Sequence, residues 1–351
     1  MRKKLYLATA VLSIICNQML FAQEPITIGH LTKIQATKLK EDRNIQVYLP
    51  TSYKDQTISK QSYPVIYLLD GETNFNYLTA YVEKLSKGPY PSIPEMIVVG
   101  IPNTNRTRDL TPSKPNELTE EQRNKIKGET GGNDNFFDFL EKDLLTYINT
   151  TYRTNGYNIL IGHSFGGITT LNYLWKNNQN FKGYLVHDPS IWWDNQYILK
   201  QYKSQPQKDF KGVKLFITQV GTSENKDHLA DHYNSIQKLN TLLQSNTYKG
   251  LTYQYKQYEG EDHGSIPLKG NLDGLRYLFD GLRINFKEID KQPTLVQDTY
   301  AKLSKDLNHP FIPNEGYLKT IITYYIKNKQ EDQIKDLIEY TKSLYPTFKI
   351  D

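Results

Sequence analysis

Cysteine is almost absent from this chain of 351 residues, since the only one, Cys16, lies close to the N-terminus. Disulfide bridges, thiolate catalysis and cysteine-ligated zinc are therefore excluded for the rest of the chain. The sequence also lacks clusters of histidine, cysteine and acidic residues at the spacings that are typical of metal ligands. We therefore expect no metal and no other cofactor.

Strong charge of one sign is lacking as well. The formal net charge is +5, and it falls to +2 without the first 22 residues, which carry three basic side chains and no acidic ones. Such a small charge gives no electrostatic reason to expect binding to nucleic acid or to an anionic membrane surface.

Residues 1–22 follow the pattern of a signal peptide. Basic residues at 2–4 precede a mostly apolar stretch at 5–15, and Ala22 is a small residue at the expected cleavage position. The apolar stretch is too short for a stable membrane span. We therefore predict a periplasmic or secreted protein whose mature chain begins at Gln23.

Strands and helices alternate through most of the remaining chain. Apolar and β-branched runs predict strands at 26–39, 45–49, 64–69, 96–101, 157–161, 182–187, 213–220 and 251–258. Helical patterns lie at 75–85, 136–152, 167–176, 229–243 and 266–286. This alternation is typical of an α/β fold in which helices cover both faces of a mainly parallel sheet, here opened by an antiparallel pair.

No strand pattern occurs in the last part of the chain. Residues 317–327 and 331–344 predict a helical hairpin similar to a single tetratricopeptide unit, and one unit cannot form a solenoid. We therefore divide the mature chain into an α/β domain at 23–290 and a small helical cap at 291–351. A surface for a protein partner is the alternative use of these helices.

A nucleophile elbow is predicted at residues 162–166, whose sequence GHSFG matches the pattern G-x-S-x-G. The motif lies directly between the predicted strand at 157–161 and the predicted helix at 167–176. A turn this sharp needs glycine near the serine, and the helix directs its N-terminal amides at the reacting centre. Ser164 is therefore the predicted nucleophile, and an ordinary Gly-Ser turn is the alternative.

The serine hydroxyl needs a general base, which in this arrangement is a histidine late in the chain, after the serine and the acid. His263 fits, because it lies in a loop after the predicted strand at 251–258, at the carboxyl edge of the sheet. The other histidines lie before the core, within the elbow or ahead of the last strand.

The acid that orients the histidine should follow the predicted strand at 213–220. Glu224 and Asp227 both lie in that loop, and Glu224 is nearer the strand end. We therefore favour Glu224, with Asp227 as the alternative. The carboxylate would hold the imidazole tautomer and stabilise the imidazolium.

An oxyanion hole requires two backbone amides. The amide of Phe165, the residue after the nucleophile, is one predicted donor. The amide of Glu72, in the loop after the strand at 64–69, is the other. An ordinary Asp-Gly turn at 70–71 is the alternative for that loop.

Four short segments occur in an order that is typical of one family: PVIYLLDG at 64–71, GHSFGG at 162–167, PSIWW at 189–193 and DHGS at 262–265. Together they resemble the putative-esterase family of α/β hydrolases, which includes esterase D, siderophore esterases, feruloyl esterases and mycolyltransferases. The resemblance spans residues 26–286. It implies an α/β-hydrolase fold, a metal-free serine esterase, the oxyanion donors named above and the acid at Glu224.

Siderophore esterases are the most similar branch, and the resemblance implies an arginine-bearing loop after the strand at 96–101. Arg106 or Arg108 would bind an anionic substrate through charge-assisted hydrogen bonds. Alternatively, Arg108 pairs with Asp109 or another nearby acid and fixes the loop. Trp193 would form a wall of the pocket, with burial in the core as the alternative.

One departure from the family lies at His187 and Asp188, where relatives often have small residues. The Asp188 carboxylate either alters the pocket or pairs with a neighbour.

The sequence therefore predicts a secreted serine esterase that acts on a small-molecule ester through an acyl-enzyme on Ser164. A siderophore ester is the favoured substrate. An acetyl or feruloyl ester of plant-wall polysaccharide is the second choice, and acyl transfer to another alcohol is the third. The alternative from another class is a binding protein that keeps the fold without catalysis.

Overall fold

The computed structural model describes residues 25–115, 120, 126, 128–176, 179–221, 230–245 and 248–350. The predicted signal peptide and the loop at 222–229, which contains Glu224 and Asp227, lie outside these residues. The described chain forms an eight-stranded sheet in the order β1-β2-β4-β3-β5-β6-β7-β8.

Every predicted strand is present in the sheet. The strands are β1 His30–Ala36, β2 Glu41–Tyr48, β3 Tyr63–Leu69, β4 Ile97–Ile101, β5 Thr154–His163, β6 Gly183–His187, β7 Val213–Val220 and β8 Leu251–Tyr258. The antiparallel pair β1–β2 opens the sheet, and β2 pairs antiparallel with β4. All pairs from β4 through β8 are parallel. The predicted mainly parallel α/β fold is therefore confirmed.

Helices cover both faces of the sheet, because each parallel connection must cross over it. The larger ones are α2 Gly71–Ser86, α7 Phe165–Lys176, α8 Trp193–Ser204, α9 Ala230–Ser245 and α10 Ile266–Leu278. Apolar residues of α2 and α10 share one core cluster with one face of the sheet, and those of α7, α8 and α9 share the cluster on the other. Strands β3 and β4 are buried at every position, as their continuous apolar sequences predict.

Two helical segments differ from their sequence patterns. The pattern at 136–152 corresponds to α5 Asn133–Asp138, a π-helical segment at Phe139–Leu144 and α6 Leu145–Thr151. Helix α8 has no counterpart among the predicted helices, and its start contains three residues with positive φ, Asp194, Asn195 and Gln196. Local propensity does not favour such a start, so the surrounding packing decides it. Among the described residues, no helix is long and apolar enough to cross a membrane.

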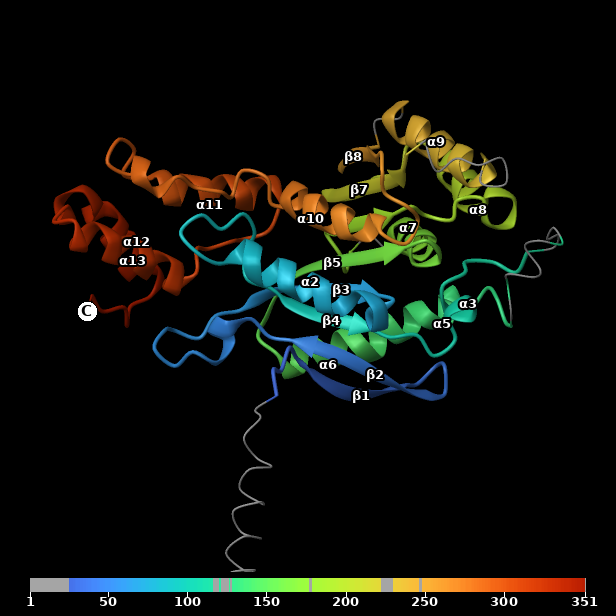
Figure 1. Ribbon diagram of the computed structural model, residues 1–351, viewed down its shortest axis with the longest axis horizontal. Helices are drawn as coiled ribbons and strands as arrows, with labels where there is room; N and C mark the ends of the chain where they lie inside the picture. The colour runs from blue at the N-terminus through green and yellow to red at the C-terminus, as the bar shows by residue number, and fades with distance from the viewer. Residues whose placement is uncertain are drawn as a thin grey trace, which may run out of the picture.

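The last three helices are α11 Leu295–Asp306, α12 Glu315–Lys327 and α13 Lys335–Leu344. In Figure 1, α12 and α13 lie on the left, whereas the arrows of β5 and β7 point to the right, toward the opposite end of the molecule. Apolar residues of these helices belong to the same core cluster as α2 and α10. A cavity of about 650 Å³ lies where they meet Tyr63 and Asn155, near the starts of β3 and β5. It is therefore remote from Ser164, which follows β5.

Phe311 connects the C-terminal helices to the α/β core. Its ring lies 5.1 Å from the ring of Tyr157 and 5.9 Å from that of Phe279. We expect Phe311→Ala to lower the free energy of unfolding by about 3–4 kcal/mol, because it leaves a cavity among these rings. Ile312→Ala should change it by less than about 0.5 kcal/mol, since Ile312 is 55% exposed.

Urea unfolding of both variants and the wild type measures the difference. Equal and small effects at the two positions would contradict the tight packing of the C-terminal helices on the α/β core.

Candidate active site

Ser164 lies in the sharp turn between β5 and α7. Its φ of +57° falls in the left-handed region that residues with a side chain seldom adopt. The turn is held by a hydrogen bond of 3.0 Å from the Ser164 amide to the carbonyl of His187, at the end of the neighbouring strand β6. This strained conformation is typical of a nucleophile elbow.

Close packing explains the glycines around the serine. A Cβ atom on Gly162 would lie 2.2 Å from the carbonyl oxygen of Gly166, and one on Gly167 would lie 2.9 Å from the Cβ of Pro189. No larger residue fits at these two positions without moving the backbone. Glycine at positions 162 and 167 is therefore required by the turn itself.

His263 lies in the loop after β8, at the same edge of the sheet. Its Nδ1 is 2.5 Å from Oδ2 of Asp188, which directly follows β6. A carboxylate accepts hydrogen bonds, so Nδ1 of His263 carries the hydrogen and Nε2 is the nitrogen that can accept a proton. This is the tautomer that a general base needs beside a serine nucleophile.

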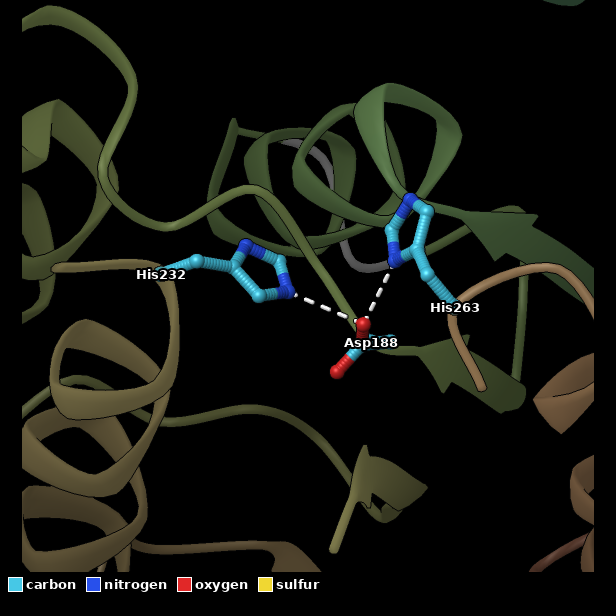
Figure 2. Close-up of side chains that lie close together, drawn as sticks. All are labelled: Asp188, His232 and His263. Carbon is cyan, nitrogen blue, oxygen red and sulfur yellow. Dashed lines mark hydrogen bonds and ion pairs between the residues drawn. The ribbon is translucent and has the colours of Figure 1, made fainter. Parts of the chain in front are cut away.

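Asp188 is fully buried and holds a second imidazole (Figure 2). Nε2 of His232, on α9, lies 2.9 Å from the same Oδ2 atom, and the amide of Val220 donates to Oδ1 at 3.3 Å. Burial by itself raises the pKa of the Asp188 carboxyl, but the hydrogen bonds from His232 and His263 outweigh it and hold that pKa well below its usual range. Asp188 is therefore ionised at neutral pH.

The Nδ1 atom of His263 thus has Asp188 as its acceptor, and Asp188 follows β6, whereas the sequence analysis placed the acid in the loop after β7. Glu224, the favoured residue for that role, and Asp227 lie outside the described residues. Strands β6 and β7 are parallel neighbours, so a residue after β6 reaches the same sheet edge as one after β7. The departure from the family at Asp188 was the sequence signal for this contact, and nothing in the sequence indicated His232.

Ser164 and His263 are brought to one site without a hydrogen bond between them in this structure. The Ser164 hydroxyl lies 3.1 Å from that of Ser190. The His263 ring lies 4.5 Å from the ring of His163, the residue before the nucleophile. Hydrogen bonds of free enzymes are often long at this position and shorten when substrate binds.

Two further histidines near the site, the partly buried His163 and the fully buried His187, are held in neutral form. Burial, aided by the neighbouring His263, lowers the pKa of His163 to about 3. Burial also lowers the pKa of His187 to about 4, and its two ring nitrogens are occupied by Thr218 and Asn271. Neither ring is therefore arranged to act as the base, which agrees with the choice of His263.

The predicted oxyanion donors lie at two converging helix N-termini. Phe165 is the first residue of α7, and Glu72 is in the first turn of α2. A Cβ on Gly166 would lie 3.2 Å from the Asp70 carboxylate, so the two helix starts are adjacent. The first amides of a helix lack partners within it and attract negative charge.

Arg106 lies beside the nucleophile turn. Its guanidinium contacts both carboxylate oxygens of Asp70, at 2.6 and 3.0 Å, and lies 5.6 Å from the centre of the Phe165 ring. Its side chain is 36% exposed, so it is partly open to solvent next to the predicted oxyanion hole.

Arg108 is less exposed, at 20%, and pairs with two acids. Its Nε lies 2.7 Å from Asp109 and its Nη2 lies 2.8 Å from Glu41. These contacts agree with the alternative in which Arg108 fixes the loop. They do not support binding of an anionic substrate by Arg108.

Trp193 does not form a pocket wall in this structure, which corrects the favoured prediction. It is 1% exposed, and its indole N–H donates to the hydroxyl of Ser113 at 3.2 Å. Its neighbour Trp192 is only partly buried, with its ring 6.1 Å from that of Phe165. Two adjacent tryptophans are alike in sequence, so the sequence alone does not tell which of them turns inward.

Comparisons with known proteins agree on one family. The family model described as putative esterase matches residues 36–266. The ferri-bacillibactin esterase of Bacillus subtilis is 28% identical over 58% of this chain and 74% of its own length. The siderophore triacetylfusarinine C esterase of Aspergillus fumigatus is 25% identical over 69% of this chain and 91% of its own length.

A solved structure is similar over nearly the whole chain. The IroE-like serine hydrolase of Shewanella oneidensis is 31% identical, with a TM-score of 0.80, and the match covers 90% of this chain and 99% of that protein. Such coverage extends the similarity beyond the α/β domain into the C-terminal helices.

Proposed function

Since the chain belongs to the putative-esterase family of α/β hydrolases and is a carboxylic-ester hydrolase, we propose that it hydrolyses siderophore esters with Ser164 as the nucleophile. The observation that carries this proposal is the placement of Ser164 on a strained turn beside the paired His263 and Asp188. The curated relatives named above are siderophore esterases, which favours a siderophore as the substrate.

In the proposed first step, the Ser164 hydroxyl attacks the ester carbonyl carbon while Nε2 of His263 takes its proton. Asp188 holds the Nδ1–H of that ring and stabilises the imidazolium. The amides of Phe165 and Glu72 donate to the oxyanion. His263 then protonates the leaving alcohol, and the acyl group remains on Ser164.

In the second step, His263 takes a proton from water, and the resulting hydroxide attacks the acyl-enzyme carbonyl. Collapse of the intermediate returns the proton to Ser164 and releases the acid. Apart from the ester and one water molecule, these two steps use only groups of this chain. The signal-peptide pattern at residues 1–22 favours a periplasmic or secreted location for it.

We propose that the guanidinium of Arg106 binds the negative charge of the substrate. We expect Arg106→Gln to raise KM for an anionic siderophore ester about tenfold, through loss of charge-assisted hydrogen bonds. KM for a neutral p-nitrophenyl ester should change much less. Arg106→Lys keeps the charge but loses the two-pronged contact with Asp70, so it is the matched control.

Steady-state kinetics of the three proteins on both esters separate the two roles of Arg106. An equal rise in KM for the neutral ester would show that Arg106 supports the structure of the site through Asp70 and does not bind the charge of the substrate.

A substrate panel tests the proposal directly. The mature chain is incubated with a cyclic catecholate triester in free and iron-bound form, with feruloylated arabinoxylan and with acetylated xylan, and products are followed by mass spectrometry. We expect kcat/KM for the siderophore to exceed the others by about 100-fold, a discrimination that a specific site can supply. Faster release of ferulate or acetate would favour plant-wall esters, and no turnover together with no labelling by a fluorophosphonate would favour a binding protein.

A further inference from the structure

Two imidazoles and a carboxylate oxygen converge behind the catalytic base. Oδ2 of Asp188 lies 2.5 Å from Nδ1 of His263 and 2.9 Å from Nε2 of His232, and the three atoms lie within 4.8 Å of one another (Figure 2). We propose that these residues form a site for a divalent transition-metal ion such as Zn²⁺, and that the ion, when bound there, stops hydrolysis.

The donor set suits such an ion. Zn²⁺ binds neutral imidazole nitrogens and carboxylate oxygens, and three protein ligands with an open fourth position are common. Asp188 is fully buried, and its carboxylate is fixed by the Val220 amide at 3.3 Å. The two histidines come from different elements, α9 and the loop after β8, so the site exists only in the folded chain.

Only a small movement is needed to admit the ion. Tetrahedral Zn²⁺ with bonds of about 2.0–2.1 Å needs ligand atoms about 3.3 Å apart. His263 is half exposed and lies in a loop, whereas His232 is 14% exposed and Asp188 is buried. The His263 and His232 nitrogens lie 2.5 and 2.9 Å from Oδ2 of Asp188, so both rings must shift, and we expect the exposed His263 to move more.

Inhibition follows from the proton positions on the His263 ring. In the present arrangement Nδ1 carries the hydrogen and donates it to Asp188, which leaves Nε2 free. A metal ion on Nδ1 replaces that hydrogen, and the neutral ring then carries its one proton on Nε2. The nitrogen that must accept the Ser164 proton is thereby occupied. The His232 ring shifts its proton to Nδ1 in the same way, so no net proton is released.

Inhibition by the metal ion depends on the proposed role of His263 as the base, whereas metal binding itself does not. The first experiment therefore measures binding alone, by calorimetric titration of the mature Ser164→Ala protein with Zn²⁺. We expect one strong site. His232→Gln in the same background should weaken it by at least about tenfold, since a ligand is lost. The glutamine amide can still donate to Asp188, so the hydrogen bond to the carboxylate is kept.

The matched control is His30→Gln. His30 is exposed and bonded to Tyr152 at 2.9 Å, far along the chain from the cluster. Its replacement should leave the strong site unchanged. Absence of a strong site, or equal binding by the His232→Gln and His30→Gln proteins, would overturn the proposed metal site whatever the enzyme's substrate.

The second experiment measures hydrolysis of a p-nitrophenyl ester against Zn²⁺ concentration, with each protein normalised to its own metal-free rate. We expect inhibition of the wild type and of His30→Gln, with full recovery after a chelator is added. The inhibition midpoint of His232→Gln should lie at least about tenfold higher. Strong binding without inhibition would overturn the proposed effect on His263.

Discussion

Ser164→Ala is expected to lower kcat for p-nitrophenyl esters by about 10⁴-fold or more, because it removes the hydroxyl on which we propose that the acyl intermediate forms. The residue sits on the turn with φ of +57°, and alanine keeps the backbone and most of the side-chain volume. Steady-state hydrolysis of a short-chain ester measures the loss, and thermal unfolding checks that the variant is folded.

Ser190→Ala is the matched control for this prediction, since the Ser190 hydroxyl lies 3.1 Å from that of Ser164. The same serine-to-alanine change at the neighbouring hydroxyl should cost less than about tenfold. A fluorophosphonate should add one mass increment to the wild type and to Ser190→Ala, and none to Ser164→Ala. Retention of hydrolysis by Ser164→Ala would show that the nucleophile lies elsewhere.

Asp188→Asn is expected to lower kcat by about 10³–10⁴-fold. The asparagine amide can present its own N–H groups to His263 Nδ1, which favours the tautomer with the proton on Nε2. That nitrogen then cannot accept a proton from Ser164. The change should also weaken the hold on His232, which donates to the same oxygen at 2.9 Å. Rates on the same p-nitrophenyl ester measure the effect.

Glu224→Gln and Asp227→Asn are the comparison for this prediction, because chain order places the acid in their loop. If Asp188 orients His263, each of these variants should lose less than about tenfold in kcat. A large loss of kcat in Glu224→Gln, with kcat of Asp188→Asn nearly unchanged, would show that the acid is Glu224, in the loop after β7.

The strands were predictable because each is a short continuous apolar or β-branched segment between turn signals. Central strand residues such as Val98 and Leu160 are apolar whichever face they point to, since helices cover both faces of the sheet. Strand boundaries were less certain: β2 begins at Glu41, in a charged stretch whose strand state depends on pairing with β1. Helix α8 was not predicted, because its first turn contains positive φ angles that the local sequence does not favour.

The places of Ser164 on the turn and of His263 in the loop after β8 were predictable for the same reason, since each is specified by its immediate neighbours. The elbow needs glycines at 162 and 167, and the base needs a loop directly after the last strand. Both requirements are local in the chain, so a single sequence contains them.

The partners of these residues were decided by the tertiary structure. Asp188 meets His263 across 75 residues of chain, and His232 meets Asp188 across 44. Adjacent parallel strands end at the same edge, so the sequence cannot tell which strand supplies the carboxylate. Likewise, packing decides that Trp193 is buried and Trp192 is partly exposed. The sequence by itself determined that Ser164 lies on a sharp turn and His263 in the loop after the last strand, because both depend on local neighbours, whereas the order of strands in the sheet determined which carboxylate contacts His263.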